Sequence, residues 1–284
     1  MTPLSNQAFI YKTPWKSSGF HFGEHRGMQR GLGFEFRNNV SLMDFPDARR
    51  INLHQTILDP YEQVQVKLFD QNNTIPVYAV CDLSSSMQFK GVSRKLDQLI
   101  EVSHSIAYSA YEAGDAFSLI SYNESVIEDL SLSLSHHLQQ AYSVIEKLNR
   151  YSTMQLNANG IFDVPQYLGN ASGLVFWISD FHMPMVLIEQ TLSAMSHHQI
   201  VPVVIWDDQE YKKLPKFGFG NMIDPESGDS RTVFFRPSIR KKFEQAFSER
   251  KTCLDSTFSN FNTRAIYLKA HYDAQELTDY FEQI

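Results

Sequence analysis

Residues 76–86 read PVYAVCDLSSS, and this stretch decides the fold. Its first six residues form a short apolar run, which is the pattern of a strand buried on both faces of a parallel sheet. The run ends at Asp82, and two hydroxyl residues, Ser84 and Ser86, follow at alternate positions. Alternate residues of an extended loop point to the same side. The stretch therefore predicts a buried strand that carries an oxygen-rich loop at its carboxyl end.

Downstream of this stretch, apolar runs alternate with segments of helical periodicity. Further strands are expected at 116–120, 126–132, 174–178, 200–206 and 265–268. Amphipathic helices are expected at 95–113, 134–148, 185–197 and 238–261, and from residue 274 onward. A β-hairpin insertion is expected around 217–235. This order predicts an α/β fold with a mostly parallel sheet and helices on both faces. Such sheets bind ligands at the carboxyl ends of their strands.

The first 73 residues have a different character. Glycine and aromatic residues interleave there without clear helical periodicity, and Val64, Val66 and Leu68 alternate with polar residues, as in a half-buried strand. The aromatic side chains are too numerous for a solvated tail. We therefore expect two parts: a β-containing region at 1–73 that packs on the main domain, and an α/β domain at 74–284.

Composition narrows the classes of function. The chain has 284 residues and a formal net charge of −7, which disfavours nucleic-acid binding because that needs a concentrated basic face. No apolar run approaches the roughly 20 residues of a membrane helix. Residues 1–16 lack the pattern of a signal peptide. Together with only two cysteines, Cys81 and Cys253, these features favour a cytoplasmic protein without disulfides.

Further oxygen ligands follow other elements of the expected sheet. Asp180 comes just after the strand at 174–178, and Thr153 lies in the loop after the second expected helix. Carboxylate and hydroxyl oxygens suit a hard cation, and two carboxylates without one would repel each other. The sequence thus predicts a site for Mg²⁺, or Mn²⁺, whose ligands are Asp82, Ser84, Ser86, Thr153 and Asp180.

Two alternatives remain open at this site. Asp82 and the serines could simply cap the following helix, although a cap would leave Asp180 unexplained. Ser152 is an adjacent alternative to Thr153 as the hydroxyl ligand.

The pattern Asp-x-Ser-x-Ser, then Thr, then Ser-Asp, resembles the metal-ion-dependent adhesion site (MIDAS) of von Willebrand factor A domains. Stretches outside the site extend the likeness: GLGFEF at 31–36, DARRI at 47–51, the strand at 64–68 and DPESG at 224–228. Together they resemble a bacterial family of von Willebrand factor A-like proteins, domain of unknown function fifty-eight. The resemblance runs from about residue 19 to the end of the chain.

The sequence also departs from that family in places. The usual Asp-Trp pair after DARRI is Asn52-Leu53 here, and the Gly-Gly that often precedes the site threonine is Tyr151-Ser152. Many members carry an N-terminal membrane hairpin, which is not found in this sequence.

The resemblance implies a function as an adaptor. Members of the family are encoded beside MoxR-type AAA+ ATPases, and the MxaS-type accessory proteins of methanol oxidation are relatives. The implied role is to work with such an ATPase in the maturation of a client complex, for example methanol dehydrogenase. The client would present an acidic residue to the bound cation.

Two other classes of function compete with an adaptor. A haloacid dehalogenase-type phosphatase also places an Asp and Mg²⁺ at the first strand end, but it needs a second Asp where Ser84 stands. A structural domain with an incidental cation is the other. No nucleophile elbow, Walker A motif or zinc-ligand spacing occurs, so no enzymatic activity is expected.

Overall fold

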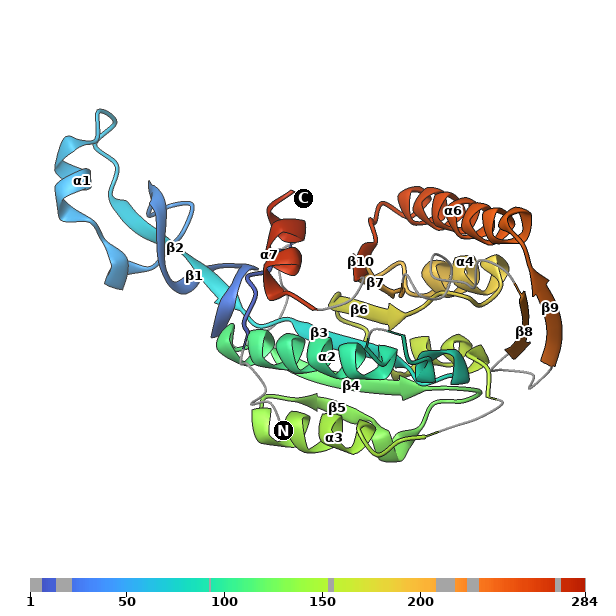
Figure 1. The fold of residues 1–284 in the computed structure, drawn as a ribbon. Coiled ribbons are helices and arrows are strands. Elements are labelled where there is room, and N and C mark those ends of the chain that lie inside the picture. Colours follow the sequence, from blue (N-terminus) through green and yellow to red (C-terminus); the bar gives the residue numbers. More distant parts are fainter. Residues whose placement is uncertain are drawn as a thin grey trace. The chain divides into compact units, whose positions relative to one another are not determined.

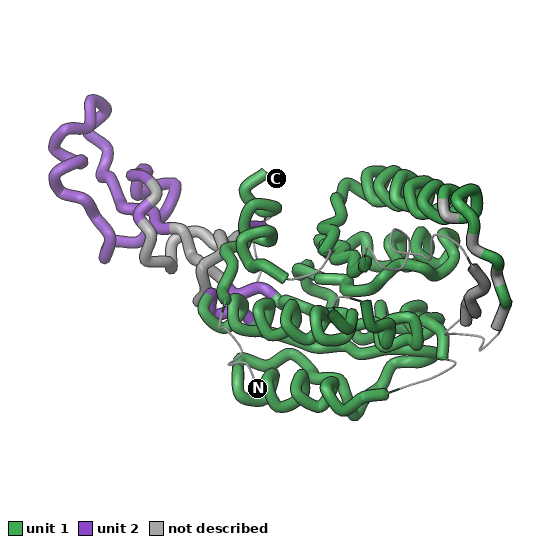
Figure 2. The backbone as a smooth tube through the Cα atoms, in the orientation of Figure 1, with its two compact units in different colours: residues 1–11, 76–112, 116–284 green, residues 12–75, 113–115 purple. Residues whose placement is uncertain are grey.

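The structure is a computed structural model. It describes residues 7–13, 22–91, 93–152, 156–207, 218–223, 230–268 and 272–283. The chain divides into two compact units (Figure 2). Unit 1 comprises residues 1–11, 76–112 and 116–284, and unit 2 comprises residues 12–75 and 113–115.

Unit 1 is built on a six-stranded sheet with the order β10-β7-β6-β3-β4-β5 (Figure 1). Its strands are β3 (Pro76–Asp82), β4 (Ala116–Tyr122), β5 (Leu132–Ser135), β6 (Leu174–Ser179), β7 (Gln199–Ile205) and β10 (Ile266–Leu268). All neighbouring strands run parallel except β4 and β5, which are antiparallel. The predicted α/β fold with a mostly parallel sheet is confirmed.

Helices cover both faces of this sheet (Figure 1). The longer ones are α2 (Lys95–Glu112), α3 (Leu138–Leu148), α4 (Met185–Ala194), α6 (Pro237–Asn260) and α7 (Ala274–Glu282). Short 3₁₀ turns are η2 (Ser85–Gln88), η3 (Glu128–Leu130), η4 (Asn159–Phe162) and η5 (Val164–Tyr167). The helix boundaries match the sequence expectations within a few residues, because each helix carries its own apolar stripe.

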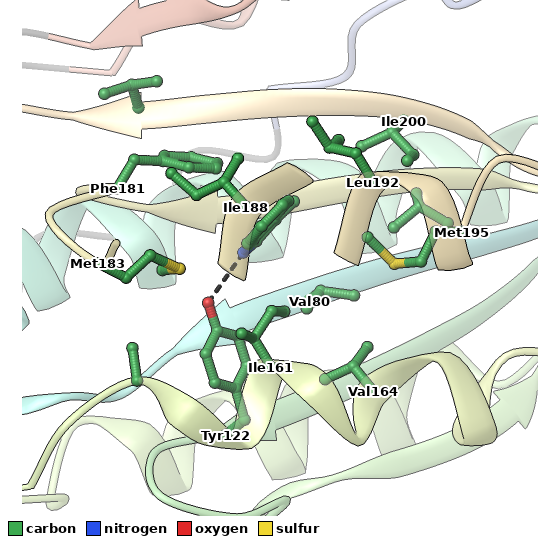
Figure 3. Packing of buried hydrophobic residues seen from close by; sticks show 14 of the residues in the cluster. Val80, Tyr122, Ile161, Val164, Phe181, Met183, Ile188, Leu192, Met195 and Ile200 are labelled. Atoms are coloured by element: carbon green, nitrogen blue, oxygen red, sulfur yellow. Dashed lines mark hydrogen bonds between the residues drawn. The ribbon is translucent and has the colours of Figure 1, made fainter. Parts of the chain in front are cut away.

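Successive residues of β6 define the two faces. Trp177 lies in a buried cluster that includes Ile188 of α4, which is labelled in Figure 3, and Phe258 of α6. Phe176, its neighbour, points to the opposite face and contacts Phe281 of α7, with ring centroids 6.1 Å apart. Both residues are fully buried, which explains the uninterrupted apolar run of this strand.

A short segment near the start of the chain also belongs to unit 1. The Phe9 ring lies 5.7 Å from the Phe176 ring and stacks on that of Phe281 at 6.3 Å, measured between centroids. Ser109 of α2 accepts a hydrogen bond from the Phe9 backbone N–H at 2.9 Å. Strand β6, helix α7 and residues 7–11 therefore share one aromatic cluster.

Unit 2 is a two-stranded antiparallel ribbon with short helices. It contains β1 (Phe22–Ser41), η1 (Ala48–Arg50), α1 (Leu53–Leu58) and β2 (Gln65–Asn73). The expected strand at 64–68 is largely present as the start of β2, where Val66 and Leu68 are buried. Helix α1 was not expected; the Asn52 side chain caps it by accepting a hydrogen bond from the Gln55 N–H. The packing of residues 1–73 on the main domain stays a prediction.

Two expectations were wrong in detail. The strand expected at 126–132 is instead a bridge at Val126, the turn η3 and then β5. The helix expected from 134 begins at Leu138, because Leu134 belongs to β5. The expected hairpin is present as β8 (Gly218–Ile223) paired with β9 (Ser230–Phe235), while its DPESG turn lies outside the described residues.

Within the described parts of the chain, no helix is long and apolar enough to cross a membrane. Cys81 is buried and Cys253 is exposed, and both are free thiols.

Candidate metal site

The loop after β3 folds over the carboxylate of Asp82, the last residue of that strand. Asp82 is fully buried, and its Oδ1 accepts a hydrogen bond from the Ser84 backbone N–H at 2.8 Å. Leu83 points into the core, where it is also fully buried. Ser84 and Ser86 lie on the same side of the loop, with their hydroxyl oxygens 3.1 Å apart. The alternation read from the sequence thus places three oxygen-bearing side chains together.

The neighbouring strand supplies the second carboxylate. β3 and β6 run parallel in register, with Cys81 opposite Ile178, so their carboxyl ends lie side by side. The Ser179 hydroxyl donates a hydrogen bond to Asp82 Oδ2 at 2.6 Å, and the Ser86 side chain is hydrogen-bonded to Asp180. Four of the five predicted ligands, Asp82, Ser84, Ser86 and Asp180, are therefore close together. Thr153 lies outside the residues that the structure describes.

The helix-cap alternative finds no support at Ser84. Ser84 is the N-cap residue of η2, yet its side chain makes no capping hydrogen bond to the backbone of that turn. Its hydroxyl instead faces Ser86. Ser152, the alternative to Thr153, is exposed.

A buried lysine completes the cluster, and sequence reasoning missed it. The Lys95 ammonium donates a hydrogen bond to Asp180 Oδ2 at 2.9 Å, and both side chains are at most 2% exposed. Lys95 is the first residue of α2. A positive side chain at a helix N-terminus interacts unfavourably with the helix dipole. The position of Lys95 in the sequence could therefore have indicated that it has an acidic partner.

The two carboxylates have opposite electrostatic environments. Burial, together with the nearby charge of Asp180, raises the pKa of Asp82 from 3.8 to about 6, although hydrogen bonds from Ser179 and Ser84 act against this. Burial is the largest single influence and acts to raise the pKa of Asp180, but the charges of Lys95 and His182 and the hydrogen bonds from Lys95 and Ser86 together hold that pKa below its ordinary value. Without a metal, Lys95 neutralises the charge of Asp180, whereas the ionised Asp82 carboxylate has no cation beside it and lowers the stability of the fold.

Buried aromatic residues support the floor of the site. The Trp177 indole N–H donates a hydrogen bond to the Tyr122 hydroxyl at 2.8 Å (Figure 3). Tyr122 in turn is hydrogen-bonded to Ser179, the residue that holds Asp82. Burial and the negative charge of Asp82 raise the Tyr122 pKa well above its ordinary value, so this hydroxyl stays protonated and available as a donor.

The loop after β6 is fixed by contacts from two other elements. Phe181 has a positive φ of 52°, an uncommon conformation for a bulky residue. Arg250 of α6 donates hydrogen bonds to the carbonyl oxygens of Phe181 and Met183, and Trp206 donates one to the Asp180 carbonyl at 2.7 Å. These bonds hold the backbone in the turn that aims the Asp180 carboxylate at the site.

A third acidic residue lies at the same edge of the sheet. Asp207 follows β7 and is 2% exposed. Its carboxylate abuts the backbone of Gly91, where an added Cβ would come 2.2 Å from Oδ2. Gly91 is therefore required for this close approach.

The donor set fits a small hard cation. The converging atoms of the predicted ligands are carboxylate or hydroxyl oxygens, which Mg²⁺ prefers. Among the residues that the structure describes, no group of three or more His, Cys, Asp and Glu side chains could hold a metal. A cation here would therefore depend on two carboxylates together with serine hydroxyls and water. The role of these residues as ligands stays a prediction.

Comparison with known proteins places the chain in a family. The family described as "Protein of unknown function DUF58" matches residues 48–253, which is most of the chain. The chain belongs to this family. No curated protein matches it.

The solved structures that match the chain include two from Bacteroides. One is the conserved hypothetical protein BatB from Bacteroides thetaiotaomicron, with a TM-score of 0.43 and 12% identity over 73% of this chain and 99% of that one. The other is an aerotolerance-related membrane protein from Bacteroides fragilis NCTC 9343, with a TM-score of 0.44 and 11% identity over 74% of this chain and 97% of that one.

Proposed function

We propose that this DUF58 protein is a metal-dependent adaptor that binds other proteins. Asp82, Ser84, Ser86 and Asp180 would hold Mg²⁺ or Mn²⁺, with Thr153 as a further ligand. The cation would keep an open position, and an Asp or Glu of a partner would fill it through a charge-assisted contact.

The main support is the convergence of four oxygen-bearing side chains from two adjacent parallel strands. Two buried carboxylates side by side are electrostatically costly, as the raised pKa of Asp82 indicates. A divalent cation between them removes that cost. The sequence pattern of these residues also resembles that of the adhesion sites of von Willebrand factor A domains, which use the cation for recruitment.

The proposed partners come from the family resemblance. A MoxR-type AAA+ ATPase is the first partner to test, and the client would be a protein complex that the pair matures. Methanol dehydrogenase is one such client, since MxaS-type proteins are relatives.

An enzymatic role is less well supported. Both Asp82 oxygens accept hydrogen bonds, from the Ser84 N–H and the Ser179 hydroxyl, and each keeps a lone pair that a cation can use. The position two residues after Asp82 is a serine, which cannot serve as the second acid of a phosphatase. We expect no metal-dependent turnover of p-nitrophenyl phosphate.

Isothermal titration calorimetry with MgCl₂ and MnCl₂ tests the metal site. Wild type should bind one cation with modest affinity, and Asp82→Asn should abolish binding while keeping the shape of the side chain. Asp279→Asn is a matched control because Asp279 is an exposed carboxylate on α7. Equal binding by wild type and Asp82→Asn would show that the site is assigned wrongly.

A pull-down with the purified MoxR-type ATPase tests the recruitment mechanism. Capture by wild type should need Mg²⁺ and be lost with EDTA or in Ser84→Ala/Ser86→Ala. Circular dichroism should show that the variant is folded, because most of the apolar core lies away from the loop. Capture that is unaffected by loss of the site would rule out recruitment through the cation.

A further inference from the structure

Lys95 places a fixed positive charge inside the candidate metal site. Its Nζ lies 2.9 Å from Asp180 Oδ2 and 5.7 Å from the centroid of the Phe89 ring. The side chain is 1% exposed, so the ammonium is removed from water almost completely. Its partner is a predicted metal ligand, 85 residues further along the chain.

Burial of the Lys95 charge lowers the stability of the fold unless an anion compensates for it. Burying an ammonium carries a large desolvation penalty, which only close pairing with an anion offsets. The first turn of α2 adds an unfavourable dipole interaction. The Asp180 carboxylate compensates for both effects, so Lys95 and Asp180 form one electrostatic unit.

The charges of the site show what this unit does to metal binding. Asp82 and Asp180 carry two negative charges when both are ionised, and Lys95 carries one positive charge. A divalent cation would neutralise the two carboxylates completely if Lys95 were absent. With Lys95 in place, the ammonium, the two carboxylates and the divalent cation together carry one positive charge in a buried setting, where charges interact strongly.

The geometry adds a second conflict. The Asp180 carboxylate has one oxygen paired with Lys95, and the other accepts a hydrogen bond from the His182 backbone N–H at 3.2 Å. A cation that takes Asp180 as a ligand must therefore share that carboxylate with the ammonium or displace it. In either case, metal binding to Asp180 weakens the Lys95–Asp180 pair.

We propose that Lys95 is a built-in cation that competes with the divalent metal for Asp180 and so sets the affinity of the site. This inference rests on the proposed metal site and adds its regulation. The lysine keeps Asp180 paired when no metal is bound, and it makes loading depend on a high free concentration of Mg²⁺.

Calorimetric titration of the full chain with MgCl₂ and MnCl₂ tests the competition. Lys95→Met removes the charge but keeps an unbranched side chain, and it should tighten metal binding by about tenfold or more. Lys95→Arg keeps the charge and should bind no more tightly than wild type. Lys147→Met is the surface control, because Lys147 is exposed on α3, and its affinity should equal that of wild type.

Removal of Lys95 leaves the buried Asp180 charge without its ammonium, so the variant will be less stable in EDTA. Thermal unfolding followed by circular dichroism measures this loss and its recovery. Added MgCl₂ should raise the melting temperature of Lys95→Met far more than that of wild type, because tighter binding to the folded state gives more stabilisation. If Lys95→Met is unfolded in EDTA, it should refold when MgCl₂ is added.

Each outcome discriminates between the two proposals. If wild type binds the cation and folded Lys95→Met binds it equally or more weakly, the competition is refuted and the metal site stands. The same holds if Lys95→Met neither folds nor refolds in MgCl₂ while wild type binds it. If neither wild type nor any Lys95 variant binds Mg²⁺ or Mn²⁺, both proposals fail.

Discussion

Asp82→Asn should stabilise the metal-free protein at neutral pH. The Asp82 carboxyl group is fully buried, and burial together with the charge of Asp180 raises its pKa to about 6 from an ordinary 3.8. Between these two pH values the folded state binds more protons than the unfolded state. Stability is therefore lost as the pH rises through this window, and the loss is complete above about pH 7.

The magnitude follows from the two pKa values. A difference between 3.8 and about 6, at 1.36 kcal/mol per pH unit, corresponds to a cost of up to about 3 kcal/mol at pH 7.5. Asparagine has the same shape without the charge. Its amide oxygen can still accept from the Ser84 N–H, but its NH₂ group would face the Ser179 oxygen, which already accepts from the Phe181 N–H, so about 3 kcal/mol is an upper value.

Urea denaturation in EDTA, at pH 7.5 and at pH 5, measures the effect. Asp82→Asn should be more stable than wild type by up to about 3 kcal/mol at pH 7.5 and by about half of that at pH 5. Asp279→Asn, an exposed control, should differ little from wild type at either pH. A lower stability of Asp82→Asn at pH 7.5, or a gain that does not change with pH, would refute the argument.

Asp180→Asn should destabilise the metal-free protein, in contrast to Asp82→Asn. Lys95 holds the pKa of Asp180 below its ordinary value, so this carboxylate contributes stability that is present at neutral pH and lost in acid. The variant leaves the Lys95 ammonium buried without its anion, which should cost about 3–5 kcal/mol in the same urea experiment. Two isosteric substitutions in one site should thus change stability in opposite directions.

Other predictions concern the supports of the site. Tyr122→Phe removes the acceptor of the Trp177 indole N–H and should lower the free energy of unfolding by about 1–3 kcal/mol, measured by urea denaturation; an unchanged value would mean that water replaces the hydroxyl. Gly91→Ala should lower the melting temperature, because its Cβ meets the Asp207 carboxylate, and Asp207→Ala in the same chain should restore much of it; no recovery in the double variant would disprove this cause. Arg250→Met should speed hydrogen exchange in the loop after β6, and protection equal to wild type would show that the two hydrogen bonds are dispensable.

The sheet could be predicted from sequence because its strands are buried on both faces. Continuous apolar runs such as residues 174–178 are typical of buried parallel strands. Most helices between these strands carry a clear stripe of apolar residues. The boundary between β5 and α3 was harder, since Leu134 fits both an alternating strand and the stripe of the helix that follows. The long strand β1 was not resolved from sequence because its glycines and bulges hide the alternation.

The candidate site was only partly visible in the sequence. Asp82, Ser84 and Ser86 lie close together in the chain, and Asp180 occupies an equivalent strand end, so their convergence could be inferred. The partnership of Lys95 with Asp180 is a tertiary contact, and no local pattern specifies it. Arg250 was missed for the same reason, because it acts on the site from a distant helix through backbone carbonyls.

The aromatic cluster of Phe9, Phe176 and Phe281 has a consequence for biosynthesis. These rings come from a segment near the start of the chain, from a central strand and from the last described helix. The ribosome therefore has to release α7 before this part of the core can close. Until then the nascent chain exposes one face of β6, and this part of the core stays open.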